Sequence, residues 1–381
     1  MSYLLPFIHG GFLYVGVFLV VLTVLVFVHE LGHYLIARRN GVRIEVFSIG
    51  FGPEIFGWWD RAGTRWKFSA IPLGGYVKMF GDSDASSGLP IARLGQLTAA
   101  EREVSFHCKR LGQRAAIVAG GPIANFVFAI VVLALLFMTY GQPFTPAEVG
   151  QVVPGSAAEA GGIRAGDTIV SIDGRPVERF EDVQQVVRLN PSVEMTMIVR
   201  REAELTTLHV TPSLIEESDR LGRHKIGQLG IRGSASKYVR RDPLSAAGRA
   251  VGETWNLSVT TLEAMWQMII GTRTTDELGG PLRIAQLSGE VAQGGIVPLL
   301  WFMAVLSVNL GLINLFPVPV LDGGHLLFYA AEAIRGKPLG QRAQEYGFRV
   351  GLALVLTLMV FATWNDLVHT GIVDIVKRFV T

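Results

Sequence analysis

The sequence has few charged residues: 17% of its 381 residues are Asp, Glu, Lys or Arg, whereas 50% are hydrophobic. A soluble globular protein usually carries about 25% charged residues. The deficit is concentrated in a few long apolar runs, which indicates a membrane protein with some soluble mass attached. The net charge of +2 is too small to favour a nucleic-acid-binding protein.

Cysteine is scarce, and the pattern of a cleavable leader is not expected at the N-terminus. The single cysteine, Cys108, excludes an intrachain disulfide framework and a cysteine-rich zinc site. Residues 1–28 contain no Lys, Arg, Asp or Glu, whereas a secretory signal peptide starts with a basic region and ends at a cleavage site. The apolar run instead continues without a break, so we interpret it as a retained transmembrane helix. No internal repeat is evident.

Four apolar runs are predicted to cross a membrane, because a helix needs roughly 20 apolar residues to do so. They cover about residues 4–37, 115–140, 291–321 and 350–364. Asn125 is the most polar residue of the second run, and prolines interrupt the third. The fourth is short, but Arg349 and Trp364 can extend it to the membrane interfaces.

Basic residues predict the orientation of the chain, since Lys and Arg are enriched in cytoplasmic loops. They are concentrated between the first and second runs and between the third and fourth runs. Both connections are therefore predicted to be cytoplasmic. The N-terminus, residues 141–290 and the C-terminus are then predicted to lie on the other side.

The region on that other side is not a simple linker. Residues 147–214 alternate apolar and polar side chains in strand-like segments, with a helix-like stretch at 180–189. This pattern predicts a small α+β domain, followed by a loop at 216–243. Further on, a stripe of apolar residues with two tryptophans recurs at helical spacing (Trp255, Val259, Leu262, Trp266, Ile269 and Ile270). The stripe suits either a helix at the membrane surface or a helix packed on the protein itself.

The chemistry is carried by a His-Glu-x-x-His motif, residues 29–33, at the end of the first apolar run. Residues four apart lie on one face of a helix, so His29 and His33 can bind one metal ion. Glu30 can accept a proton from a zinc-bound water and return it to the leaving amine. Ionisable groups inside a membrane are expensive and usually mark a functional site.

A catalytic zinc ion has three protein ligands and one open position. The third ligand must come from elsewhere in the chain, and the segment that ends the third run offers Asp322 and His325. Imidazole is the commoner zinc ligand, which slightly favours His325. The motif chemistry alone leaves both residues as candidates.

These residues resemble the site-2 protease family of intramembrane zinc metalloproteases. The resemblance rests on residues 29–33 and on the Asn-x4-Asn-Leu-x-Pro-x-Pro-x-Leu-Asp-Gly-Gly pattern at 309–324. Segments 47–53, 72–78 and 120–125 also resemble family segments, so the likeness covers the whole chain. The resemblance implies that Asp322 is the third ligand of one zinc ion per chain, with His325 as the alternative.

The same resemblance implies roles for other residues near the catalytic centre. Asn309 and Asn314 correspond to asparagines that are plausible hydrogen-bond donors to the substrate or to the developing oxyanion. Asn309 also suits a plain helix-packing role. Segment 72–78, with Gly74, Gly75 and Tyr76, resembles a membrane-dipping β-loop that holds the substrate as an added strand.

The small α+β domain resembles a bacterial PDZ domain, on the segments 155–158, 160–167 and 172–174. PDZ domains bind peptide ends or extended segments at an exposed strand edge. Family members that cleave anti-sigma factors carry two such domains in tandem, whereas this chain has room for one. That departure puts in doubt any mechanism in which two such domains exclude intact substrates by their size.

The predicted fold is a polytopic α-helical membrane protein of about four transmembrane helices, with an inserted PDZ domain and a membrane-dipping β-loop. The predicted parts are a first transmembrane helix (1–40), a cytoplasmic-side segment with the β-loop (41–114), a second transmembrane helix (115–140), a periplasmic PDZ domain (145–216), an amphipathic membrane-surface segment (244–290), a third transmembrane segment (291–335), a fourth transmembrane helix (347–367) and a tail (368–381).

The predicted function is intramembrane zinc-dependent proteolysis in a bacterial inner membrane, with the active site toward the cytoplasm. Expected partners are the lipid bilayer, single-span membrane protein substrates and a peptide segment in the PDZ groove, with no nucleic acid. Pre-trimmed anti-sigma factors and remnant signal peptides are the two substrate classes. A metal transporter or sensor and a catalytically inactive scaffold are the alternatives. A transporter would have no need of Glu30, and the intact ligand set argues against an inactive scaffold.

Overall fold

The computed structural model describes residues 4–81, 97–177, 179–219, 222–234, 237–270, 280–337 and 339–369. The chain forms two compact units. The helical unit comprises Met1–Ala134, Ala247–Leu262 and Thr275–Thr381, and the strand-rich unit comprises Leu135–Ala246 and Glu263–Thr274.

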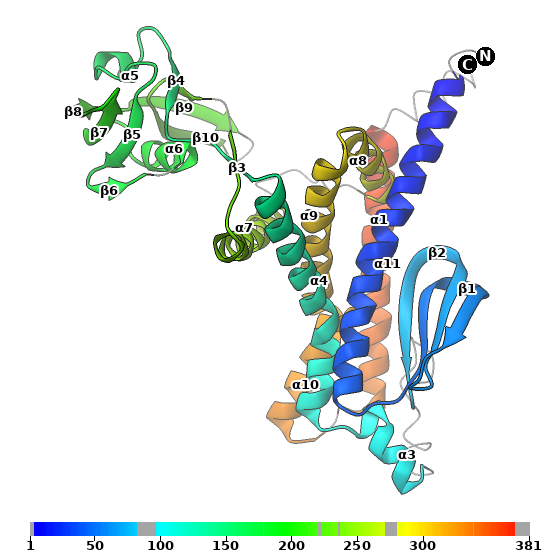
Figure 1. Cartoon of the computed structure of the whole chain (residues 1–381). Helices are drawn as coiled ribbons and strands as arrows, with labels where there is room; N and C mark the ends of the chain where they lie inside the picture. The colour runs from blue at the N-terminus through cyan, green and yellow to red at the C-terminus, as the bar shows by residue number, and fades with distance from the viewer. Residues whose placement is uncertain are drawn as a thin grey trace. The chain divides into compact units, whose positions relative to one another are not determined.

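Within the described residues, four helices are long and apolar enough to cross a membrane, as the sequence predicts. They are α1 (Leu4–Arg39), α4 (Leu111–Thr139), α9 (Ile296–Leu315) and α11 (Gln341–His369) (Figure 1). The fourth span is longer than its apolar run, because the helix of α11 continues through polar residues at both ends. Between α1 and α4 lie the short helices α3 (Ala99–Val104) and η1 (Phe106–Cys108).

The third predicted segment, 291–335, comprises the end of one helix and two further helices. Residue 291 still belongs to α8 (Pro281–Gln293), and Gly295, at φ 99°, separates α8 from α9. Pro317 and Pro319 then follow the end of α9, because proline cannot continue a helix, and α10 (Asp322–Arg335) begins after them. Residues 316–321 form the short connection between the two helices, and Asp322 is the first residue of α10.

Glycines allow α1 and α4 to approach each other at backbone distance. A Cβ atom added to Gly32 would lie 2.2 Å from the carbonyl oxygen of Gly120, and one added to Gly120 would lie 2.9 Å from that of Gly32. Small residues at such crossings let membrane helices pack closely. The motif-bearing end of α1 is therefore fixed against α4.

Two long strands, β1 (Ile44–Trp59) and β2 (Arg65–Met79), lie alongside α1 (Figure 1). Both strands bend, so residues 44–49 pair with residues 75–79 on one side and with residues 65–68 on the other. Residues 54–59 pair with the far side of residues 65–69. The hairpin is thus a small sheet of four segments, in which 75–79 is an edge.

Asp60 at the tip of this sheet anchors it to α1. Its carboxylate accepts hydrogen bonds from the hydroxyl of Tyr34 (2.8 Å), the indole of Trp66 (3.1 Å) and the backbone N–H of Thr64 (2.9 Å). Burial alone would raise the pKa of Asp60, but these hydrogen bonds outweigh it and lower the pKa to about 2. The carboxylate is therefore ionised at neutral pH and holds sheet and helix together.

The strand-rich unit confirms the predicted strands and the predicted helix. A four-stranded sheet has the order β6-β5-β7-β8, and α6 (Phe180–Leu189) is amphipathic. The elements in order are β3 (Gln142–Phe144), β4 (Val149–Val152), α5 (Ala157–Ala160), β5 (Thr168–Ile172), β6 (Arg175–Pro176), α6, β7 (Met195–Arg201), β8 (Glu204–Val210), β9 (Ser213–Asp219), β10 (Gly222–Gln228), β11 (Ile231–Gly233) and β12 (Lys237–Val239).

The predicted loop at 216–243 is wrong. This stretch contains β10, which pairs with β9, and β11, which pairs with β4. Leu229 between them is buried in the core of the unit. β11 escaped prediction because its partner β4 lies far away in the sequence, whereas β10, in a hairpin with β9, escaped it because its sequence is mostly polar and Gly-containing.

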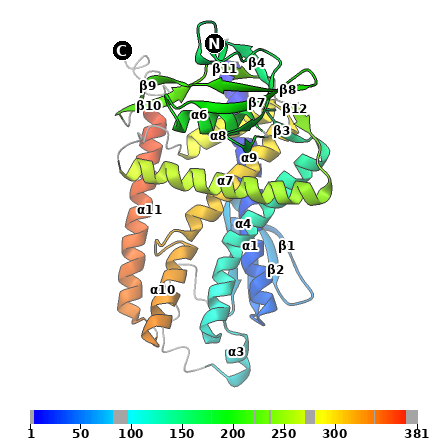
Figure 2. The same cartoon turned by 90° about the vertical axis from the view of Figure 1, so that its left-hand side faces the viewer.

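The predicted amphipathic segment 244–290 consists of α7 (Pro243–Ile269), residues 271–279 outside the described part, and α8. Asp242 caps α7 by accepting hydrogen bonds from the backbone N–H groups of Leu244 and Ser245. Figure 2 shows α7 along its length. Trp255 and Trp266 of the apolar stripe are 69% and 62% exposed, whereas Val259 is half-buried.

Candidate metal centre and catalytic glutamate

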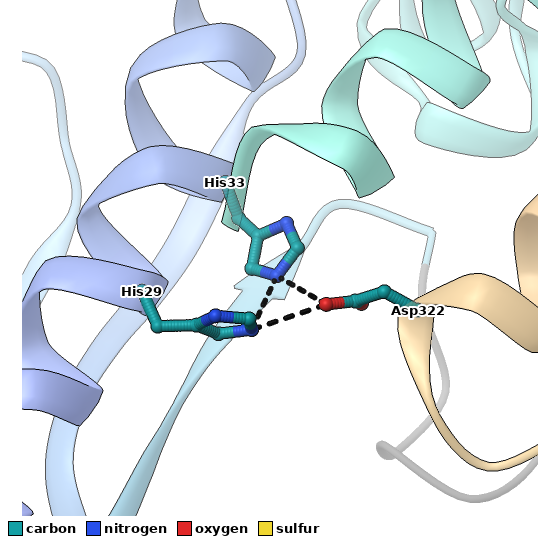
Figure 3. A group of neighbouring side chains, drawn as sticks. All are labelled: His29, His33 and Asp322. Carbon is teal, nitrogen blue, oxygen red and sulfur yellow. Dashed lines mark hydrogen bonds and ion pairs between the residues drawn. The ribbon is translucent and has the colours of Figure 1, made fainter. Parts of the chain in front are cut away.

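The two histidines of the motif lie one turn apart near the end of α1. Their rings meet edge to face, with centroids 4.8 Å apart, and their Nε2 atoms are 3.2 Å apart. His29 is buried, and its ring faces the same point as that of His33 (Figure 3). The i, i+4 spacing thus places both lone-pair donors side by side.

Asp322, the first residue of α10, faces this pair from a segment almost 300 residues away. Its Oδ2 atom lies 3.1 Å from Nε2 of His29 and 3.5 Å from Nε2 of His33 (Figure 3). Two glycines let the start of α10 approach the preceding turn closely. A Cβ atom on Gly323 would lie 2.2 Å from the carbonyl oxygen of Leu315, and a Cβ atom on Gly324 would lie 2.3 Å from the carbonyl oxygen of Val318. The start of α10 therefore packs directly on the turn that follows α9.

His325, the alternative ligand, lies elsewhere in this arrangement. Its ring packs against Phe348 on α11, with centroids 5.3 Å apart. Among the described residues, the group that gathers within 4.8 Å is His29, His33 and Asp322. The geometry therefore favours Asp322 over His325, which the chemistry of the motif left open.

The three ligand atoms have the spacing of a tetrahedral zinc site. Zn–N and Zn–O distances of about 2.0–2.2 Å with tetrahedral angles put neighbouring ligand atoms roughly 3.3 Å apart. The three separations here are 3.1, 3.2 and 3.5 Å. Oδ2 of Asp322 is shielded from solvent, and within the described chain its polar neighbours are these two rings. Two imidazoles and one carboxylate suit zinc and leave a fourth position open.

Gly121 on α4 forms one wall of the site. A Cβ atom at this position would lie 2.3 Å from Nε2 of His33 and 2.8 Å from Cε1 of His29. Only a residue without a side chain leaves room for the two rings and an ion. The sequence analysis did not assign Gly121 to the site, although the Gly-Gly-Pro segment containing it was noted.

The remaining ring nitrogens are held by α4. Nδ1 of His33 lies 2.9 Å from the carbonyl oxygen of Ile117, and Nδ1 of His29 lies 3.1 Å from Nδ2 of Asn125. Asn125 was not predicted as a site residue, although it is the most polar residue of its span. That isolated polarity was the signal that could have identified it.

Glu30 lies close to both the ligand triad and the sheet. The backbone N–H of Val77 on β2 donates a hydrogen bond to its carboxylate. A Cβ atom on Gly75 would lie 3.5 Å from Cγ of Glu30 and 2.7 Å from the carbonyl oxygen of Ser48. The edge segment 75–79 therefore runs beside the proposed general base.

Other predicted site residues lie on the same sheet or on α9. Gly74 has φ 94° and lies under the ring of Phe51, which stacks on Tyr76 at 6.0 Å. Asn309 accepts a hydrogen bond from the hydroxyl of Thr261 on α7 (3.0 Å). Asn314 lies half-buried in the last turn of α9. The substrate-binding roles of these residues stay predictions.

Comparison with known proteins gives one family over most of the chain. Residues 17–358 match the model of peptidase family M50. A protein of Rhizobium meliloti named as a candidate zinc metalloprotease is 48% identical over 92% of this chain and 95% of its own length. The metalloprotease MmpA of Caulobacter vibrioides is 39% identical, over 94% of this chain and 96% of its own length.

A solved structure of a PDZ domain from Listeria innocua is also similar to part of the chain. It is 18% identical, covers 24% of this chain and 98% of its own length, and has a TM-score of 0.20. A similarity of this size carries no argument for the fold. The PDZ assignment of the strand-rich unit stays a prediction from its sequence motifs.

Proposed function

Because the chain belongs to peptidase family M50, we propose that it is an intramembrane protease that cleaves peptide bonds in or near the membrane-spanning segment of single-span proteins. The family and the relatives named as zinc metalloproteases make the chain a metalloprotease with zinc as its cofactor. The proposal adds the location of the chemistry, the roles of individual residues and the class of substrate.

His29, His33 and Asp322 would hold the zinc ion, since their ligand atoms already have tetrahedral spacing. When bound, zinc supplies a Lewis acid that polarises the scissile carbonyl and lowers the pKa of the attacking water. Glu30 accepts a proton from that water and returns it to the leaving amine. The N–H of Val77 keeps the Glu30 carboxylate oriented for both transfers.

The edge segment 75–79 would bind the substrate as an added strand. Its backbone is paired with residues 44–49 on one side, and its other side borders Glu30. A helical peptide bond is shielded by its own backbone, whereas main-chain hydrogen bonds to a sheet edge hold a substrate extended. Asn309 and Asn314 would complete the site as hydrogen-bond donors to the substrate or to the oxyanion.

The substrate class follows from where the ligands lie. The motif ends a helix that is apolar enough to span a membrane, so the cleaved bond would lie near the cytoplasmic face of a bacterial inner membrane. Pre-trimmed anti-sigma factors and remnant signal peptides both present single spans of this kind. The strand-rich unit would bind a peptide segment on the periplasmic side, at a hollow lined by Pro154, Ser156 and Gly230.

The convergence of His29, His33 and Asp322 beside Glu30 is the observation that carries the proposal. It is tested with the full chain in lipid nanodiscs, wild type and Glu30→Gln, on a model single-span substrate. The bound zinc is counted by elemental analysis. We expect the variant to keep about one zinc ion per chain while cleavage falls by a factor of about 10² to 10⁴, the usual contribution of a general base.

A matched control is Glu290→Gln, which replaces an exposed glutamate on α8. Its zinc content and its cleavage rate should equal those of the wild type. Continued cleavage by Glu30→Gln would contradict the proposed mechanism. Loss of zinc in that variant would show that Glu30 acts as a ligand or as a structural residue.

A further inference from the structure

The two histidines of the metal centre are held by different kinds of hydrogen-bond partner. A carbonyl oxygen can only accept, so the contact of 2.9 Å with Ile117 requires a proton on Nδ1 of His33. The lone pair of the neutral ring is then on Nε2, which faces the metal position. The backbone of α4 thus fixes His33 as a ligand.

His29 has a side-chain amide in the corresponding place. Nδ1 of His29 lies 3.1 Å from Nδ2 of Asn125, and an amide nitrogen can only donate. In that arrangement the proton of the neutral ring is on Nε2, which blocks that atom as a metal ligand. This is the form expected of His29 without an ion, and Nε2 lies 3.1 Å from Oδ2 of Asp322.

Rotating the amide of Asn125 by half a turn gives the other form of His29. Asn125 is 0% exposed, and its Oδ1 atom has no hydrogen-bond partner in the described part of the chain. Exchanging Oδ1 and Nδ2 lets Oδ1 accept a hydrogen bond from Nδ1–H of His29 and frees the lone pair of Nε2. In either orientation one amide atom is without a partner, so the orientation of the amide and the tautomer of the ring are coupled.

We propose that Asn125 is a positioning residue that selects the metal-binding tautomer of His29 by turning its amide oxygen to Nδ1. Zinc-bound histidines usually donate their other ring N–H to an oxygen, which fixes the ring and makes it a better ligand. The hydroxyl of Ser307 on α9 donates to the backbone carbonyl of Asn125 at 2.9 Å, a contact that does not involve the side-chain amide. The inference rests on the zinc site of the proposed function.

The test compares Asn125→Leu, Asn125→Asp and Ser307→Ala in the full chain, by competition for zinc with a chelator of known affinity. Leucine has a similar volume but accepts no hydrogen bond, so the zinc affinity of Asn125→Leu should fall by about 10- to 100-fold. Aspartate keeps the acceptor and should retain most of the affinity. Ser307→Ala perturbs the same residue without touching His29, and its affinity should stay within about threefold of the wild type.

Thermal unfolding of each zinc-free variant separates ligand positioning from folding. A zinc affinity of Asn125→Leu within about threefold of the wild type would overturn the proposal. An equal loss in Ser307→Ala would overturn it as well, because a merely structural role predicts that result. If Asn125→Leu does not fold, Asn125→Ala replaces it, with the same affinity threshold.

A further variant separates this inference from the proposed zinc site. If His33→Ala binds zinc as tightly as the wild type, the site itself is wrong. If His33→Ala loses zinc and Asn125→Leu does not, only the role of Asn125 is wrong.

Discussion

The helical unit and the strand-rich unit distribute polar and apolar side chains in opposite ways. In the strand-rich unit the buried cluster is apolar, with Ile169, Met197 and Val199 fully enclosed. In the helical unit large apolar side chains are exposed along the spans, such as Val350 (67%) and Val360 (66%) on α11. Three buried polar residues, His29, Asn125 and Ser307, instead form a hydrogen-bonded chain inside it.

This difference shows which buried polar groups indicate function. The strand-rich unit also buries a charge, Asp167, but Arg201 and the backbone N–H of Arg164 satisfy it completely. In the helical unit Nε2 of His29, Nε2 of His33 and Oδ2 of Asp322 instead converge within 3.5 Å of one another. Buried polar groups whose hydrogen bonds are all formed stabilise a fold, whereas buried acceptor atoms that face one common point indicate a binding site such as that of a metal ion.

The largest expected effect is the loss of the third ligand. Asp322→Asn removes the charged oxygen that faces both histidine rings. Loss of a hydrogen-bond partner of a metal ligand typically lowers metal affinity by a factor of about 10–100. Loss of the ligand itself should lower the zinc affinity by more than that. Cleavage of a model substrate should be abolished. Zinc affinity is measured by chelator competition, and cleavage by gel assay.

The control for this prediction is His325→Gln, at the residue that packs on Phe348. It should retain zinc and most of the activity. A result in which His325→Gln loses zinc and Asp322→Asn keeps it would reverse the assignment of the third ligand.

The next largest effect is expected at Gly121. Gly121→Ala adds a methyl group 2.3 Å from Nε2 of His33, so the ring must move away from the metal position. We expect loss of zinc with a helix content like that of the wild type, measured by elemental analysis and circular dichroism. Gly112→Ala, on the same helix with nothing within 4 Å of the added Cβ, should keep its zinc. Full zinc occupancy in Gly121→Ala would contradict the conclusion that Gly121 forms a wall of the metal site.

The sequence was sufficient for the half of the site that lies on one helix. The i, i+4 spacing of His29 and His33 and the adjacent Glu30 predict their own geometry, since helix periodicity fixes it. The same holds for the apolar spans and for strands such as β7, where alternation is strong. In each case neighbours in the sequence determine the structure.

The other half of the site depends on contacts between distant segments, which no local pattern contains. Residue chemistry alone left Asp322 and His325 as alternatives, because the choice depends on how closely Gly323 and Gly324 let α10 approach the preceding turn. Gly121 and Asn125 escaped assignment for the same reason. Their roles require the crossing of α1 and α4 at Gly32 and Gly120.

A smaller effect, confined to the strand-rich unit, is expected from the ion pair of Asp167. Burial alone would raise the pKa of Asp167, but hydrogen bonds from Arg201 and from the Arg164 N–H outweigh it and lower the pKa. Asp167→Asn should lower the melting temperature of this unit by about 4–8 °C at pH 7, a shift typical of one lost interaction in a domain of this size. Zinc binding should not change.

The pH dependence of this effect has a definite sign. A carboxyl group with a depressed pKa in the folded state stabilises the fold above its unfolded pKa of about 3.9, and this contribution is lost as the pH falls through the folded pKa. The difference between wild type and Asp167→Asn should therefore shrink below about pH 4. Hydrogen exchange at Thr168–Ile172 measures it, with Glu204→Gln at an exposed position as the control. A difference that grows in acid would contradict the assignment.

The smallest effect is expected on α7, where the two interpretations of the tryptophan stripe can be separated. Trp255 and Trp266 are exposed, so a helix at the membrane surface should place their indoles among lipid headgroups. The fluorescence of each indole is obtained as the difference between the wild-type spectrum and that of Trp255→Phe or Trp266→Phe. Brominated lipids in nanodiscs should quench this difference fluorescence. Cleavage should change by less than about threefold, because neither indole touches the metal centre. Unquenched difference spectra would mean that another protein surface, and not lipid, covers the stripe.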